Sequence, residues 1–374
     1  MNSAELRLPV KTLAWAAHTM SMSLGDVAAQ ISTKDKTREQ VLQGIMTFPQ
    51  IKKFAELTKK PLGFLFLEKP PEKIQIDLPD LRTRQQGVAL SDDFLDIYKD
   101  ILFKQEWYKD FIKKTTSNEL DFVNSFTISS DTKEIANNIR KVLGISRQDS
   151  LSAKDIEEYY DVLSKKAENA GIIVFRNSVV KSNNHRPLNA DEFLGFAIPD
   201  KFAPSIFING ADKTAAKNFT IAHELAHIWL GQGGISDISI DTQNLIEKKC
   251  NQIASEFLVP QSDFLTAWEN EDGNLGSKLS NLRRRFRVSE LVIARVAKEN
   301  GKITNAEYWT LYNAAVEVYK HLPKVSGGNG NAIARLHNSR KLTDTVNSLL
   351  KVGRVSFKEA GLLLNKSPMK VGLN

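Results

Sequence analysis

The chain has 374 residues, of which 41% are hydrophobic and 25% are charged, and its formal net charge is +7. These values are those of an ordinary soluble protein, long enough for two or three domains with buried cores. The single cysteine excludes a disulfide framework, no apolar run is long enough to span a bilayer, and the N-terminus lacks a signal-peptide pattern. We therefore expect a cytoplasmic protein with no membrane partner.

Residues 1–70 are predicted to form a domain of short helices. The expected helices are Leu6–Thr19, Leu24–Ile31 with Ser23 as its N-cap, Thr37–Gly44 and Phe48–Lys59. This spacing resembles the repressor-type (Xre-type) helix-turn-helix domain, although Leu42 stands where such domains commonly have tryptophan. The resemblance implies DNA contact in the major groove through Lys34, Lys36, Arg38 and Gln40. A helical bundle that only docks onto the rest of the protein is the alternative.

Residues 71–90, which follow Pro70 and contain Pro71 and Pro79, predict a linker to the central domain, residues 91–322. The central domain is expected to begin with helices at 92–114, 132–142 and 152–169, the first packing its aromatic side chains into the core, Phe103 included. Three strands are predicted at 171–175, 193–198 and 205–208, with a turn-rich excursion at 183–187 that holds an exposed His185.

The apolar run Phe219–Leu230 contains the pattern His-Glu-Leu-Ala-His at residues 223–227. Residues four apart lie on one face of an α-helix, so His223 and His227 present two imidazoles to one point. Glu224 lies about 100° further round the helix, where a carboxylate can reach a metal-bound water without displacing it. The pattern therefore predicts a metal-dependent hydrolase in which both histidines bind Zn²⁺ and Glu224 is the catalytic base. Two core histidines are the structural alternative.

The third metal ligand must come from later in the chain, because Gly233, six residues after the second histidine, offers no donor atom. The glycines at 231, 233 and 234 instead indicate the end of the helix. Residues 245–260 predict a second amphipathic helix, in which Glu247 lies about 60° from the centre of the apolar stripe and Glu256 about 120° away on the other side. Glu247 is therefore the leading candidate and Asp241 the next. The remaining acidic candidates are Asp237 and Glu256.

The segments 219–231 and 247–260, together with 191–197 and 204–212 upstream, resemble the ImmA/IrrE family of bacterial zinc metallo-endopeptidases. The resemblance implies that Glu247 completes the zinc site with His223 and His227. It also implies an α+β, mostly helical fold with a zincin-like core, in which a small β-sheet accompanies the zinc helix and the Glu247 helix. Cys250 stands where the family usually has alanine. We expect it to be a buried packing side chain, with a reactive thiol near the zinc as the alternative.

The C-terminal part of the chain is strongly basic. Residues 275–374 contain 18 Lys/Arg and 6 Asp/Glu, a net charge of +12, which leaves −5 for residues 1–274. This asymmetry favours a surface for nucleic acid or for an acidic protein, or a solvated basic face. Helix-turn-helix-like patterns at 279–297 and 356–371 flank a flexible break at 327–330, and residues 323–374 are predicted to form a separate helical region.

Together these patterns predict a zinc endopeptidase that acts in regulation by cleaving or controlling a repressor or another partner protein. Strands placed directly before the zinc helix suit an extended peptide substrate, which adds to a sheet edge. Family resemblance also supplies an alternative of another class. In that alternative the protein is an antitoxin or transcriptional regulator that neutralises a PIN-like nuclease toxin and binds DNA.

Overall fold

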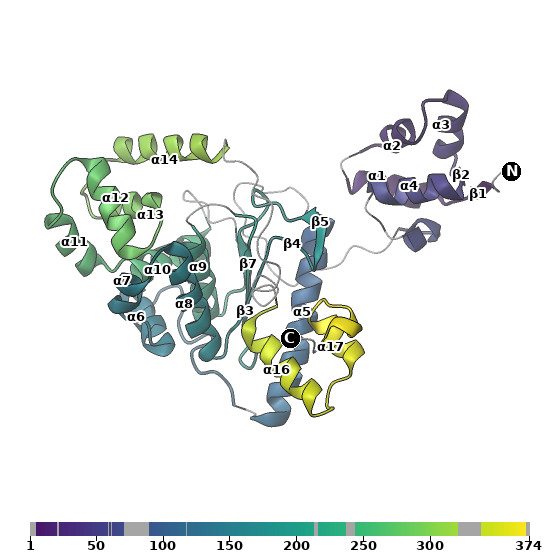
Figure 1. Ribbon diagram of the computed structural model, residues 1–374. Helices are drawn as coiled ribbons and strands as arrows, with labels where there is room; N and C mark the ends of the chain where they lie inside the picture. The colour runs from purple at the N-terminus through teal and green to yellow at the C-terminus, as the bar shows by residue number, and fades with distance from the viewer. Residues whose placement is uncertain are drawn as a thin grey trace. The chain divides into compact units, whose positions relative to one another are not determined.

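The computed structural model describes residues 5–20, 22–58, 60, 62–70, 90–116, 118–212, 216–236, 244–320 and 338–371. The chain forms two units, Met1–Asp77 and Leu78–Asn374, which we describe separately (Figure 1). Residues 71–89 of the predicted linker, the acidic candidates Asp237 and Asp241, and the predicted break at 327–330 lie outside the described residues.

The smaller unit packs short helices around its own core, which includes the fully buried side chains of Leu13, Val41 and Phe54. Its elements are β1 (Glu5–Arg7), α1 (Val10–His18), α2 (Leu24–Ile31), α3 (Asp35–Leu42), β2 (Ile45–Thr47), α4 (Phe48–Thr58) and the 3₁₀ helix η1 (Leu62–Phe66). The prediction of a helix from Leu6 is wrong at its start. Residues 5–7 pair antiparallel with β2, and α1 begins after Pro9, because a proline ring clashes with the preceding turn in a helix interior.

The helices α2 and α3 are joined by the three residues 32–34. Ser23 caps α2 as predicted, with its side chain accepting from the Asp26 amide. Two of the side chains predicted to contact DNA bind within the unit. Arg38 donates to the carbonyl oxygens of residues 32 and 33, and the Gln40 amide donates to Glu5. Binding of DNA by this unit stays a prediction.

The larger unit is an α+β fold dominated by helices, as predicted. Its helices are α5 (Asp92–Thr115), α6 (Thr132–Leu143), α7 (Arg147–Ser152), α8 (Ile156–Asn169), α9 (Lys217–Leu230), α10 (Leu245–Leu258), α11 (Gln261–Glu269), α12 (Leu275–Phe286), α13 (Glu290–Glu299), α14 (Asn305–Lys320), α16 (Arg340–Lys351), α17 (Phe357–Leu363) and the 3₁₀ helix η2 (Pro368–Lys370). Its strands are β3 (Ile173–Asn177), β4 (Val179–Val180), β5 (Asn183–Pro187), β6 (Gly195–Ile198), β7 (Ser205–Asn209) and β8 (Gly234–Ser236).

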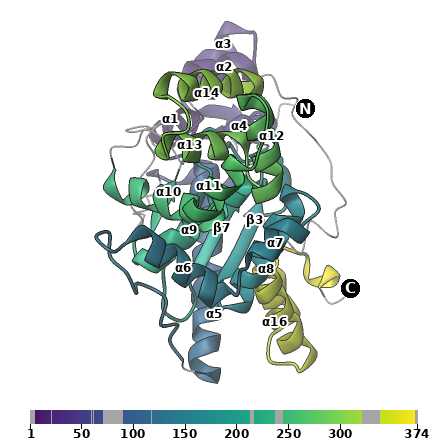
Figure 2. The same ribbon diagram turned by 90° about the vertical axis from the view of Figure 1, so that its left-hand side faces the viewer.

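A four-stranded sheet with the order β3-β7-β6-β8 forms the centre of this unit. The strands β3 and β7 are parallel, whereas β6 pairs antiparallel with β7 and with β8. Side chains alternate between the two faces of a strand. Ala197 and Ile206 join the core cluster that α8 and α9 contribute to, while Phe196 faces the opposite side, where its ring meets that of Phe94 from α5 at 5.7 Å. Figure 2 shows α8 and α9 beside β3 and β7.

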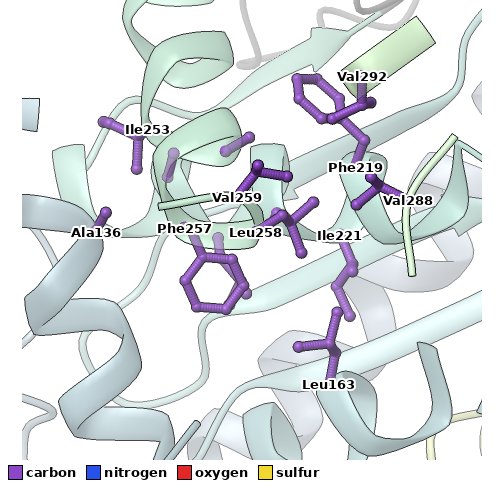
Figure 3. Packing of buried hydrophobic residues seen from close by; sticks show 14 of the residues in the cluster. Ala136, Leu163, Phe219, Ile221, Ile253, Phe257, Leu258, Val259, Val288 and Val292 are labelled. Carbon is purple, nitrogen blue, oxygen red and sulfur yellow. The ribbon is translucent and has the colours of Figure 1, made fainter. Parts of the chain in front are cut away.

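The helices α6, α9, α10 and α13 share one hydrophobic core with the sheet. In Figure 3, Phe219 of α9 lies against Val288 and Val292, and Leu163 of α8 points toward Ile221. This packing fixes α9 on several sides, so its two histidines are held on a rigid element. Among the described residues, no helix is both long and apolar enough to cross a membrane.

Three local predictions require correction. Phe103, assigned to the core, is 48% exposed on α5. The helix predicted from Ser152 begins at Ile156, because Asp155 adopts an extended conformation and caps α8 by accepting from the Glu158 amide. Residues 183–187 form a strand, β5, that pairs with β4, although the side chain of His185 is exposed as expected. At the C-terminus, Pro368 begins the 3₁₀ helix η2, which spans only three residues.

The C-terminal segment 338–371 packs against α5 and α8 of the larger unit (Figure 1). A buried polar cluster joins them. The Lys104 Nζ atom on α5 donates to Asp100 at 2.6 Å and to the Asn338 side chain at 2.9 Å, and Asn365 also donates to Asp100 at 2.9 Å. Ser339 donates to the carboxylate of Glu168 on α8. The basic end of the chain is therefore anchored by internal polar contacts.

Candidate metal centre

The helix α9 carries both predicted metal-binding histidines and is buried from Asn218 to Leu230. A helix that is apolar on nearly all sides is stable only inside a core, which explains its position between the sheet and α10. It ends at Gly231, whose φ of +62° is a left-handed conformation that favours glycine. A Cβ atom there would also lie 2.5 Å from the Cβ atom of Asn124, so glycine is required by space as well. Gly231 thus ends the helix as predicted, while Gly234 begins β8.

The turn after α9 orients the second histidine. The carbonyl oxygen of Gln232 lies 2.6 Å from His227 Nδ1, and since a carbonyl only accepts, Nδ1 carries the proton. His223 makes the equivalent contact at 3.1 Å with the side-chain oxygen of Asn251 on α10. When both rings are neutral, as metal binding requires, each Nε2 atom therefore presents a lone pair to the same point. Asn251, one turn after Glu247, thus lies where it can orient the ring of His223.

Glu247 meets the two histidines at that point. It lies in the first turn of α10, which is capped by the side chain of Asn244, and it is 1% exposed. Its two carboxylate oxygens lie 3.1 Å from His223 Nε2 and 3.1 Å from His227 Nε2, and these two nitrogens are 3.1 Å apart. A tetrahedral zinc ion with bonds of 2.0–2.1 Å separates its ligand atoms by about 3.3 Å. The separations of the two Nε2 atoms and of each from a Glu247 oxygen are thus close to those of zinc ligands. Glu256 lies elsewhere on α10 and accepts from the Gln261 amide.

The electrostatics of this cluster call for a positive charge. Burial favours the neutral form of Glu247, but the two histidines outweigh it and hold the pKa of Glu247 far below its usual range. Burial lowers the pKa of His223, with Glu247 opposing. Burial would also lower the pKa of His227, yet Cys250 and Glu247 together raise it well above the usual value. No lysine or arginine pairs with Glu247 in the described parts of the chain, so a bound cation is the natural counter-charge.

Glu224, the predicted base, is fully buried on the sheet side of α9. Neither of its oxygens has a partner at hydrogen-bond distance among the described residues, although the Ser236 hydroxyl is close enough to lower its pKa. Burial, with a further contribution from Glu247, raises the pKa of Glu224 to about 8. A metal ion beside the carboxyl would lower that value.

Gly195 of β6 makes room for this carboxylate. A Cβ atom at Gly195 would lie 2.8 Å from Glu224 Oε1 and 3.0 Å from the carbonyl oxygen of Phe207, closer than real Cβ contacts. The absence of a side chain at position 195 therefore lets the carboxylate lie directly against the strand. Nothing in the sequence marks Gly195 as part of the site, because only the packing of α9 on β6 brings it next to Glu224.

Two further side chains lie at the site without having been assigned to it. Ser236 of β8, the register partner of Gly195, places its hydroxyl 3.4 Å from His227 Nε2 and 3.4 Å from Glu247 Oε1. Cys250 is fully buried, and its Sγ atom and one nitrogen of each histidine lie within 4.8 Å of one another. Cys250 follows Glu247 by three residues, which places both on one face of α10. That spacing was the available signal, while β8 itself was not predicted.

Comparison with protein families agrees with this geometry. Residues 167–298 match the Peptidase_M78 model, described as the IrrE N-terminal-like domain. The match supports the ImmA/IrrE family. It spans β3 to α13 and so includes both metal-site helices and the sheet beneath them. No curated protein and no solved structure matches the chain.

Proposed function

We propose that this protein is a zinc-dependent endopeptidase of ImmA/IrrE type, with Zn²⁺ held by His223, His227 and Glu247. The observation that carries the proposal is the convergence of two Nε2 atoms, 3.1 Å apart, on the Glu247 carboxylate, each 3.1 Å from a different oxygen, with both Nδ1 atoms held by acceptors. The match to a peptidase family over residues 167–298 supports the same activity.

Zinc in this position supplies a Lewis acid that polarises a peptide carbonyl and activates a water molecule. Glu224 takes the proton of the attacking water on a carboxylate oxygen and returns it to the leaving amide nitrogen. Its buried, unpaired oxygens leave it free to accept that proton. Asn251 and the Gln232 carbonyl keep the two imidazoles in the ligating tautomer, and the surrounding core excludes water from the base.

An extended polypeptide is the substrate class that best suits the site. The strand β8 is at the edge of the described sheet, and Ser236 at its end lies beside the metal position. A peptide that adds to β8 through main-chain hydrogen bonds would bring a scissile carbonyl to this place. We propose a regulatory target, such as a repressor or another partner protein in the cytoplasm, since the α2–α3 pair and the basic C-terminal part favour association with a regulatory complex.

The decisive experiment compares wild-type protein with Glu224→Gln. The amide keeps the size of the carboxylate but takes up no proton, so zinc content and fold should persist while cleavage falls by about 10²–10⁴-fold. Glu119→Gln, a change of the same chemistry at a surface ion pair with Lys201, is the matched control and should cleave normally. The products of the neighbouring genes serve as test substrates.

Undiminished cleavage by Glu224→Gln would exclude the proposed mechanism. If instead neither protein cleaves and both neutralise a neighbouring nuclease equally well, the antitoxin function is favoured over the peptidase.

A further inference from the structure

Cys250 occupies a position that the proposed three-ligand site does not use. Its side chain is fully buried, and the thiol contacts the ring of His227. Its Sγ atom belongs with one nitrogen of each metal-binding histidine to a set whose members all lie within 4.8 Å of one another. In a tetrahedral zinc site, a sulfur at 2.3 Å and a nitrogen at 2.05 Å from the metal are about 3.6 Å apart. The Sγ atom is therefore at most about 1.2 Å further from these nitrogens than in such a site.

A second observation, independent of the cysteine, points to the same place. Both oxygens of Glu224 and the Oε2 atom of Glu247 are buried without a hydrogen-bond donor among the described residues. Apart from the two histidines, no basic side chain of the described residues pairs with Glu247, and a divalent cation held by the two imidazoles would satisfy these oxygens and the thiol together.

We infer that Cys250 is the fourth metal ligand in the resting protein, where its thiolate holds the position that water takes during catalysis. This inference rests on the proposed metal site. When it forms, the Sγ–metal bond replaces the metal–water bond, the thiol proton leaves to solvent, and the displaced water is released. The reverse exchange, in which a proton and a water molecule return, opens the site. No oxidant is needed, because the sulfur keeps its oxidation state.

The test uses Co²⁺ as a spectroscopic replacement for zinc in the full-length chain. Wild-type protein should show the near-ultraviolet charge-transfer absorption of a thiolate–cobalt bond, and this band should be lost in Cys250→Ala although cobalt still binds. Cys250→Ser, which keeps a side chain of similar size, should also bind cobalt without the band. Glu224→Gln should keep the band, since this variant changes the base and not a ligand. With zinc, Cys250→Ala should turn over substrate faster than wild type.

The outcomes separate this inference from the proposed function. Cobalt bound by wild-type protein without a sulfur band overturns the ligand assignment and leaves the peptidase site intact. A band in wild type with no gain in turnover for Cys250→Ala overturns the resting-state role. Failure of wild type and variants alike to bind either metal overturns the metal site, and the inference with it. A band without any cleavage removes the peptidase while Cys250 stays a ligand.

Discussion

Two buried polar clusters of the larger unit differ in how their buried charges are paired. At the junction with the C-terminal segment, the charge of Lys104 is neutralised by Asp100, and the amides of Asn338 and Asn365 fill remaining positions. Between α9 and α10, two histidines, two glutamates and a thiol converge, and no lysine or arginine of the described residues pairs with Glu247. The first cluster is complete within the chain, whereas the proposed zinc ion would complete the second.

The comparison shows that burial of charge alone does not mark a functional site. Burial lowers the pKa of Lys104, but Asp100 opposes this shift. The pair is therefore a structural ion pair that needs no ligand. At the metal centre the balance of donors and acceptors is unequal, because both Nδ1–H groups are already used. An excess of buried acceptors over donors is therefore the physical sign of a cation site.

The largest effect on stability is expected at the Lys104–Asp100 cluster. Lys104→Met leaves Asp100 buried without its cation and should lower the free energy of unfolding by about 3–5 kcal/mol. Hydrogen exchange should also increase in residues 338–371. Denaturant unfolding measures the first effect, with the exposed Lys201→Met as a control that should remain close to wild type. Wild-type stability of Lys104→Met would show that the cluster is not the anchor inferred here.

The stability conferred by the cluster between α9 and α10 should depend on added metal instead. Zinc at about 100 to 1,000 times its dissociation constant should stabilise the protein by about 2.7–4.1 kcal/mol, and a chelator should remove this gain. Glu247→Gln, which loses a charged ligand, should lose most of the response, while Lys104→Met should keep it. Thermal unfolding with and without zinc measures the difference. An equal zinc response in wild type and Glu247→Gln would exclude Glu247 as a ligand.

The space beside the base offers a more selective test. Gly195→Ala places a Cβ atom against Glu224 Oε1 and should displace the carboxylate, lowering kcat by about 100-fold with zinc content unchanged. Gly276→Ala on α12 is the control, since its Cβ would meet only the Asn274 side chain at 3.5 Å. Steady-state kinetics and metal analysis distinguish this effect from loss of zinc. Normal turnover by Gly195→Ala would remove the proposed role of the glycine.

A smaller effect on stability is expected at Asp200, whose carboxylate pairs with Lys109. Burial would raise the pKa of Asp200, but Lys109 and the amides of Phe202 and Ala203 lower it below the usual 3.8. Its contribution to stability is thus present above about pH 4 and is lost as the pH falls through the folded value. Asp200→Asn should cost about 1 kcal/mol at neutral pH and little in acid. Denaturant unfolding at both pH values measures this, and an equal cost in acid would contradict the assignment.

Local sequence patterns predicted the elements whose geometry depends on near neighbours. The i, i+4 spacing of His223 and His227 and the end of the helix at Gly231 follow from helix geometry and backbone sterics, as does the inward position of Glu247. The match of residues 167–298 to the IrrE N-terminal-like domain supports the family that these patterns indicated. The start of α1 was missed because Pro9 and the pairing of β1 with β2 outweigh the helical pattern of the residues around them.

The His-Glu-Leu-Ala-His pattern and the face of the following helix thus determined the type of chemistry, because both are properties of a single helix. Only the tertiary structure decided what surrounds it. The pairing of β6 with β8 places Gly195 beneath the base and Ser236 beside the metal position, and the packing of α9 on α10 brings Cys250 to the two imidazoles. These contacts join residues far apart in the chain, and no local periodicity encodes them.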